Sequence, residues 1–273
     1  MNRPRVAVVV FPGSNCDTDA AHAVETVMGA DARLVWHDAA DVGDPDLVVL
    51  PGGFSYGDYL RSGAMARFSR VMESVRSFAA KGGAVLGICN GFQVLCEAGL
   101  LPGVLLRNAG LRFVCRDVFV RVESTATPFT AALGTGEVLR IPIAHGDGNW
   151  QASAETLREV TARGEVVFRY VDRRGERAPG ANPNGSLEDV AGLRNEAGNV
   201  LGLMPHPERA SELLLGSADG AKLFRSFAAS LAASLPASLA ASLAPPASRL
   251  PSLLAPAVPA VRAVRAVTAS DGV

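Results

Sequence analysis

The sequence is short of lysine, of aromatic residues and of concentrated charge. Only two lysines, Lys81 and Lys222, occur among its 273 residues, and neither stands in a G-x-x-x-x-G-K-[ST] pattern. A phosphate-binding loop of the Walker type is therefore excluded. The formal net charge is −1, and the basic residues form no stripe. This balance disfavours nucleic acid as a partner.

Cysteine is also scarce, and its spacing argues against a metal or disulfide framework. The four cysteines, Cys16, Cys89, Cys96 and Cys115, form no C-x-x-C pair, and no histidine stands at zinc-ligand spacing from them. We therefore expect no metal, with Cys96 and Cys115 in the core. No signal peptide precedes the first apolar run, and no apolar stretch suits a membrane span. We expect a reducing, cytoplasmic setting and no membrane partner.

What the sequence does contain is an alternation of strand and helix signals. Apolar residues make up 48% of the chain, enough for an α/β domain with a buried core. We expect strands over residues 5–11, 32–36, 46–50 and 84–88, and helices over 20–28 and 62–80, the first of them capped by Asp17 or Thr18. This order predicts an α/β fold with a mostly parallel sheet and helices on both faces. Ligands of such sheets bind at the carboxyl ends of the strands.

The second half of the chain has a different pattern, with short strands separated by turns, which is typical of antiparallel pairing. Candidate strands cover residues 111–122, 137–143, 165–170, 190–194 and 200–204, and a last helix is expected over 217–230 with Ser217 as its cap. We place one domain over residues 1–229. Residues 230–273 are rich in Ala, Ser, Leu and Pro, which predicts a disordered tail. A partner-binding helix is the alternative for this segment.

The stretch from Ala84 to Gln93 carries the strongest functional signal. Its apolar run ends at Cys89, which Gly87 and Gly91 flank two residues away on each side. A G-x-C-x-G pattern between a strand and a helix is typical of a nucleophile elbow, whose tight turn needs glycine. The helix dipole favours a thiolate at this position. A buried core cysteine is the alternative, since cysteine is among the most buried residue types.

His206 and Glu208 can supply the base that a cysteine nucleophile needs. On an extended segment, residues two apart point the same way. Glu208 could then orient the imidazole while His206 takes the proton of Cys89. A surface turn that contains both residues is the alternative. Together with the elbow, the pattern predicts a Cys-His-Glu triad.

Backbone donors for a developing oxyanion are also present. The N–H group of Asn90 follows the nucleophile, and Gly53 belongs to a Gly-Gly loop after a strand. An ordinary turn between strand and helix is the alternative for that loop, and it would be preferred if the elbow were absent. Two polar loops, over residues 144–149 and 182–186, fit either turn chemistry or binding. In the second loop, Asn184 and Gly185 are candidates for substrate contact.

These motifs resemble the class I (triad) glutamine amidotransferases, through G-I-C-N-G-F-Q at 87–93 and H-P-E at 206–208. Within that family, several stretches resemble the glutaminase subunits of phosphoribosylformylglycinamidine synthase. They are F-P-G-S-N-C-D (11–17), P-G-G-F-S-Y-G-D-Y-L-R-S-G-A (51–64), P-I-A-H-G-D-G-N (142–149), N-P-N-G-S (182–186) and M-P-H-P-E-R (204–209). Two features depart from the family. Asp147 stands where it more often has Glu, and the tail has no counterpart.

The resemblance implies a flavodoxin-like glutaminase fold, with Cys89 as nucleophile, His206 as base and Glu208 as its partner. By position, Gly53 and Asn90 would form the oxyanion hole. L-Glutamine would be the substrate, hydrolysed through a thioester to glutamate and ammonia. By the same resemblance, Gln93 would approach the bound glutamine.

The resemblance also implies a place in an assembly. The ammonia would pass to a separate large synthetase subunit. The two would be bridged by a small third subunit. The synthetase would use ATP and Mg²⁺, and this chain would need no cofactor. Three alternatives stay open: a glutaminase for another acceptor, a non-catalytic flavodoxin-like regulatory subunit, and a cysteine peptidase on a related scaffold.

Overall fold

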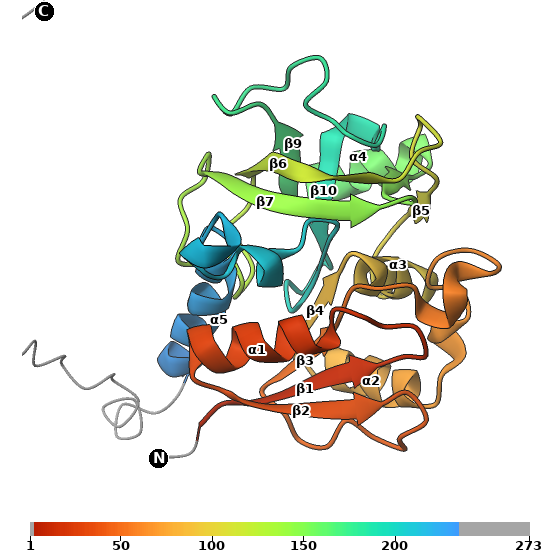
Figure 1. Cartoon of the computed structure of the whole chain (residues 1–273), viewed down its shortest axis with the longest axis vertical. Coiled ribbons are helices and arrows are strands. Elements are labelled where there is room, and N and C mark those ends of the chain that lie inside the picture. The colour runs from red at the N-terminus through yellow and green to blue at the C-terminus, as the bar shows by residue number, and fades with distance from the viewer. Residues whose placement is uncertain (1–2, 235–273) are drawn as a thin grey trace, which may run out of the picture.

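The computed structural model describes residues 3–234 (Figure 1). The strands are β1 (Arg5–Val10), β2 (Asp31–Trp36), β3 (Leu47–Leu50), β4 (Ala84–Ile88), β5 (Val104–Leu106), β6 (Val114–Val122), β7 (Val138–His145), β8 (Asn149–Gln151), β9 (Val166–Val171), β10 (Val190–Arg194) and β11 (Val200–Leu203). The helices are α1 (Asp17–Met28), α2 (Val71–Ala80), α3 (Asn90–Glu97), α4 (Ala154–Ala162) and α5 (Ala221–Ser234). Five 3₁₀ turns accompany them, η1 (Ser55–Asp58), η2 (Ala66–Phe68), η3 (Leu187–Asp189), η4 (Pro207–Ala210) and η5 (Leu213–Leu215).

One half of the main sheet is parallel. Its strands run in the order β2-β1-β3-β4-β11, and each neighbouring pair is parallel. The residues from Val6 to Val9 and from Leu47 to Leu50 are all buried, so both faces of these strands are covered. Figure 1 shows α1 and α2 packed around this half. The sheet and its helical cover were predicted from the β-branched runs.

The other half continues the same sheet with antiparallel pairs. From β11 the order is β10-β9-β6-β7, and every pair in it is antiparallel. Strand β11 therefore joins the halves, because it also pairs in parallel with β4. A separate short pair, β5 with β8, stands outside this sheet. The predicted α/β fold with an antiparallel portion is confirmed.

Several local predictions were wrong for identifiable reasons. The helix expected over 62–80 is interrupted, and α2 begins only at Val71. Gly63 has a φ of +78°, and a Cβ there would lie 2.7 Å from the backbone nitrogen of Val94, so its close approach to α3 prevents a helix from beginning at residue 62. Ser69, with ψ 142°, then separates η2 from α2. Cys16, which makes no capping hydrogen bond with its side chain, occupies the N-cap of α1. Ser217 bonds the carbonyl of Arg140 instead of beginning the last helix.

Other elements had no clear sequence signal. Strands β5 and β8 are three residues each, and α4, which Ser153 caps, was not predicted. Cys96 is buried as expected, whereas Cys115 is exposed on β6. Helix α5 runs to Ser234, past the expected domain end at residue 229. The rest of the predicted tail, 235–273, lies outside the described residues. Among the helices of residues 3–234, none combines the length and the apolar character needed to cross a membrane.

Candidate active site

Cys89 stands at a strained turn at the centre of the sheet. Strand β4 lies between β3 and β11 and ends at Ile88, and α3 begins at Asn90. Cys89 between them has φ 49° and ψ −104°, a conformation that is unfavourable for any residue with a Cβ. A Cβ on Gly91 would collide with the carbonyl oxygen of Leu50, and one on Gly87 would lie 2.8 Å from the backbone of Gly91. This is the geometry that the glycine spacing predicted.

A cavity of about 290 Å³ opens in front of this turn. Its lining includes Cys89, Gly53, Gln93, His145 and Asp147. Cys89 is 4% exposed, so it is largely shielded from solvent but still contributes to the cavity wall. Gly53 and Cys89 therefore meet at the carboxyl edge of the sheet, as their positions after β3 and β4 predicted.

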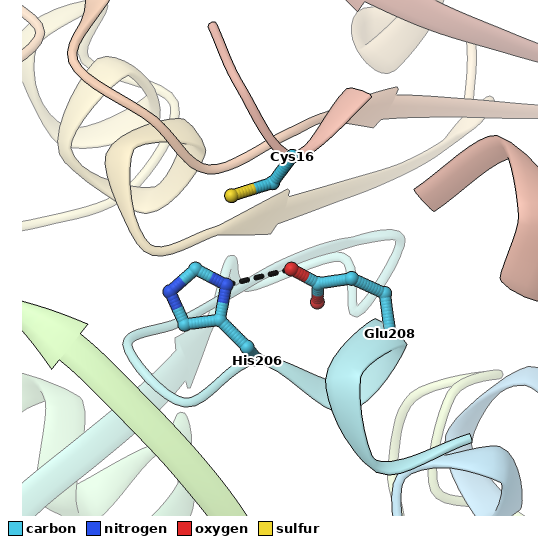
Figure 2. A group of neighbouring side chains, drawn as sticks. All are labelled: Cys16, His206 and Glu208. Carbon is cyan, nitrogen blue, oxygen red and sulfur yellow. Dashed lines mark hydrogen bonds and ion pairs between the residues drawn. The ribbon is translucent and has the colours of Figure 1, made fainter. Parts of the chain in front are cut away.

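His206 and Glu208 form a buried pair in the same region. Nδ1 of His206 lies 2.6 Å from Oε1 of Glu208, and Figure 2 shows the carboxylate directed at the ring. The backbone N–H of His206 donates to the carbonyl of Pro142 in β7. Glu208 belongs to the 3₁₀ turn η4, whereas the prediction assumed an extended segment. The predicted contact between the two side chains is therefore present, but the backbone conformation that produces it is a turn.

The surroundings of His206 favour its charged form. Burial opposes the charge on the imidazole. The carboxylate of Glu208, with the neighbouring thiol groups of Cys89 and Cys16, nevertheless raises the pKa of His206 well above its ordinary value. The influence of Cys89 on this pKa indicates that Cys89 and His206 lie in the same region of the structure. His206 and Glu208 are in contact, and the part of Cys89 as the third member of the triad stays a prediction.

Cys16 is a second thiol beside this ring, and no sequence pattern predicted it there. Its sulfur and the ligand atoms of His206 and Glu208 all lie within 4.8 Å of one another (Figure 2). Such a set could ligate zinc in principle. However, Nη2 of Arg209 lies 3.1 Å from the Cys16 sulfur, and a fixed guanidinium there would repel a metal cation. Nδ1 of His206 is also already occupied by Glu208. The cluster therefore fits a hydrogen-bonded network better than a metal centre.

The proposed oxyanion donors are both available. Gly53 has a φ of +137°, and a Cβ there would lie 2.7 Å from the backbone nitrogen of Asn15. The neighbouring N–H of Phe54 is already bonded to the carbonyl of Gly13. Among the residues described, neither the N–H of Gly53 nor that of Asn90 has a hydrogen-bond partner. Two free donors near the nucleophile are what an oxyanion requires.

Of the other predicted binding residues, one lines the cavity and two lie outside its lining. Gln93 lines the cavity, but its carboxamide accepts from Nδ2 of Asn90 at 2.8 Å and donates to the carbonyl of Asp147. The structure does not bring Asn184 and Gly185 to the cavity lining. Asn184 is buried and donates to the carbonyl of Gly148 at 2.8 Å, so it supports the loop after β7 from behind.

Charged side chains also line the cavity. Asp58, Asp147 and Arg107 all line it, and Ser62 donates to Asp147 at 2.8 Å. Burial is the main cause that raises the pKa of Asp58 to about 6. A hydrogen bond from Ser62 opposes this rise, and the charge of Asp147 adds to it. No local pattern in the sequence indicated that Asp58, about thirty positions before Cys89, would face the same cavity.

The chain belongs to the family of CobB/CobQ-like glutamine amidotransferase domains, which it matches over residues 3–222. It is 59% identical to the phosphoribosylformylglycinamidine synthase subunit PurQ of Salinibacter ruber, over 81% of this chain and 94% of that relative. Its identity with the subunit of the same name from Rubrobacter xylanophilus is also 59%, over 82% of this chain and 98% of the relative.

Solved structures agree with this assignment. A chain in the structure of PurLQS from Thermotoga maritima is 47% identical and superposes with a TM-score of 0.75, covering 84% of this chain and 99% of that one. A putative GMP synthase protein from Thermoplasma acidophilum is 16% identical with a TM-score of 0.56, which shows a shared fold alone. The flavodoxin-like glutamine amidotransferase fold that the motifs implied is confirmed.

Proposed function

We propose that this chain is the glutaminase subunit of phosphoribosylformylglycinamidine synthase and acts in purine biosynthesis. It hydrolyses L-glutamine to glutamate and ammonia. A partner synthetase subunit then uses the ammonia to convert formylglycinamide ribonucleotide to its amidine. The observation that carries the proposal is the cavity lined by Cys89, close enough to the buried His206–Glu208 pair for Cys89 to influence the pKa of His206, in a chain whose relatives match it over almost their whole length.

The first half of the reaction follows from this geometry. The sulfur of Cys89 attacks the side-chain carbonyl carbon of glutamine, and a C–S bond forms while the carbonyl electrons move to oxygen. The N–H groups of Gly53 and Asn90 donate to that oxygen. His206, which has taken the thiol proton of Cys89, then gives a proton to the nitrogen, the C–N bond breaks and ammonia leaves. Glu208 holds the ring and stabilises its positive charge while His206 carries that proton.

The second half returns the enzyme to its starting state. Water attacks the glutamyl thioester, and His206 accepts a proton from the water. The C–S bond breaks, and glutamate departs. Cys89 rather than Cys16 takes the nucleophile's role, because Cys89 lines the cavity and occupies the strained turn. Cys16 is not part of the cavity lining, and its sulfur contacts the guanidinium of Arg209.

The charged side of the cavity suits the other end of the substrate. Free glutamine carries an ammonium and a carboxylate group at its α-carbon. Asp58 and Asp147 can face the ammonium group, and Arg107 can face the carboxylate. Gln93 contributes by fixing the carbonyl of Asp147 and the side chain of Asn90.

The proposal includes the assembly that a glutaminase of this kind serves. Its partners are the large synthetase and a small bridging subunit, and the relative in the PurLQS structure supports this arrangement. ATP and Mg²⁺ belong to the synthetase, and this chain uses no cofactor of its own. A cytoplasmic location is part of the same proposal.

An assay with two nitrogen sources tests the function. The chain and its synthetase partner should make the amidine from glutamine and also from ammonium chloride. Cys89→Ala should abolish only the glutamine-dependent reaction. Ammonia release without amidine formation would instead indicate a different acceptor. If glutamine is not hydrolysed even in the assembled complex, the chain has a regulatory role and the proposal is wrong. The isolated chain should hydrolyse glutamine slowly, since uncoupled release wastes ammonia.

A further inference from the structure

His145 lies at the end of β7, and its tautomer can be deduced from its neighbours. Nδ2 of Asn108 donates to the carbonyls of Arg112 and His145, each at 2.9 Å, which fixes the orientation of the amide. The oxygen of Asn108 therefore faces the ring, 3.0 Å from Nδ1 of His145, and also accepts the N–H of Gly148. Because an amide oxygen only accepts, Nδ1 of His145 must carry the proton.

The other ring nitrogen is then a lone-pair acceptor. His145 is 3% exposed, and within residues 3–234 its Nε2 atom has no hydrogen-bond partner. A buried acceptor without a partner is unfavourable in a folded protein and calls for an explanation. Burial, and next the charge of His206, lower the pKa of His145 to about 4, so the ring stays neutral at physiological pH.

The position of His145 indicates which group it could meet. Its side chain lines the same cavity as Cys89. The preceding carbonyl, of Ala144, lies 3.9 Å from the Cys89 sulfur, and Pro142 of the same strand holds the backbone of His206. Strand β7 therefore places His145 in the wall of the cavity that Cys89 lines, close enough to His206 for the charge of His206 to act on its pKa.

Resting on the proposed function, we propose that Nε2 of His145 accepts a hydrogen bond from the carboxamide N–H of glutamine, and from ammonia as it departs. No bond to His145 is made or broken, and the proton that ammonia gains still comes from His206. A neutral lone pair attracts an N–H group and repels the oxygen of a carboxylate or an ester. His145 would therefore favour the amide substrate over the glutamate product.

Two substrates separate this role from a structural one. L-Glutamine offers the N–H group, whereas the γ-methyl ester of L-glutamate forms the same thioester without it. In the full chain assembled with its synthetase partner, His145→Phe keeps a ring but removes the acceptor. We expect it to lower kcat/KM for glutamine about 30- to 100-fold, the range for a lost hydrogen bond in a buried site, and that for the ester less than about threefold. His145→Gln, which restores an acceptor oxygen, should recover at least part of the glutamine activity.

The outcomes distinguish this inference from the function on which it rests. Equal losses with both substrates, no loss with either, or a His145→Gln variant no better than His145→Phe would overturn the inference alone. A wild-type complex that releases no ammonia from glutamine would overturn the proposed function and the inference with it. His22→Leu, a substitution of a half-exposed histidine outside the cavity lining, is the matched control and should change neither rate.

Discussion

The imidazole of His206 meets the carboxylate of Glu208 at 2.6 Å, in a place where neither side chain is more than 2% exposed. A short contact of this kind holds the ring in one tautomer and stabilises its positive charge. It also occupies Nδ1, whereas Nε2 of His206 has no hydrogen-bond partner among the described residues. We therefore expect catalysis to depend on this pair as much as on the thiol.

Replacing the carboxylate tests the pair directly. Glu208→Gln keeps an acceptor for Nδ1 but removes the charge, so kcat for glutamine should fall about 10²- to 10⁴-fold with little change in KM. Ammonia release in steady state is the measurement. Glu212→Gln, which alters the exposed carboxylate beside His22, is the control and should leave kcat near the wild-type value. A Glu208→Gln enzyme within threefold of the wild type would contradict the assignment.

The same pair predicts a pH-dependent stability. The raised pKa of His206 means that the folded protein holds this proton more tightly than the unfolded chain does. The stabilisation is complete below the unfolded pKa of about 6.5 and is lost as pH rises through the folded pKa. Glu208→Gln should therefore lower the free energy of unfolding most at pH 6, by about 3 kcal/mol, and less at pH 9. Urea denaturation at both pH values measures this, and a gap that widens with pH would disprove it.

The elbow predicts a strict size limit at Gly91. A Cβ there would press on the carbonyl oxygen of Leu50, a backbone atom of the neighbouring strand that cannot move aside. Gly91→Ala should therefore lower the free energy of unfolding by about 3 kcal/mol. Gly110→Ala is the matched control, because a Cβ there meets nothing within 4 Å. Equal denaturation midpoints for the two variants would show that the turn is less constrained than the structure indicates.

Asp58 should carry a stability cost at neutral pH. Its φ is +53°, and its pKa is raised to about 6, chiefly by burial. The folded protein thus loses stability relative to the unfolded chain as pH rises from about 4 to 6. Asparagine tolerates this backbone conformation, so Asp58→Asn removes the charge without adding strain. It should raise the free energy of unfolding by about 1 kcal/mol at pH 8, after allowance for solvent screening, and by little at pH 4.

A control defines the Asp58 result. Asp44 is almost wholly exposed, so Asp44→Asn should give no comparable gain between pH 4 and pH 8. Thermal unfolding of both variants, followed by circular dichroism, provides the comparison. An Asp58→Asn protein that is stabilised equally at both pH values would show that its backbone conformation, rather than its charge, is the cause.

The sequence predicted those parts of the fold that local patterns determine. The buried runs of β1 and β4 and the glycines around Cys89 each specify their structure within a few residues. The late start of α2 was not predictable, because Gly63, within the expected helix, is constrained by the backbone of Val94 in α3. Contacts of this kind depend on how distant elements pack, and no local pattern records them.

The residues of the site also fall into those that local patterns predict and those that only long-range packing brings together. Cys89, His206 and Glu208 were identified from spacing and resemblance, and the structure shows His206 in contact with Glu208 and Cys89 in the wall of the cavity. Cys16 reaches the ring of His206 from the other end of the chain. The tautomer of His145 depends on Asn108, which is 37 positions away. These relationships arise only when α1, β7 and η4 meet at the edge of the sheet.

The identity of the nucleophile is the central claim, and trapping the thioester tests it most directly. The full chain with its partner would be mixed with glutamine, quenched in acid and digested with trypsin, and the adduct located by fragmentation mass spectrometry. We expect the glutamyl group on Cys89, within the peptide 82–107, and its absence from Cys89→Ala. Cys16→Ala should still form it, with turnover reduced by no more than about tenfold, as for a group that acts only through the ring. An adduct on Cys16, in the peptide 6–33, would contradict the account.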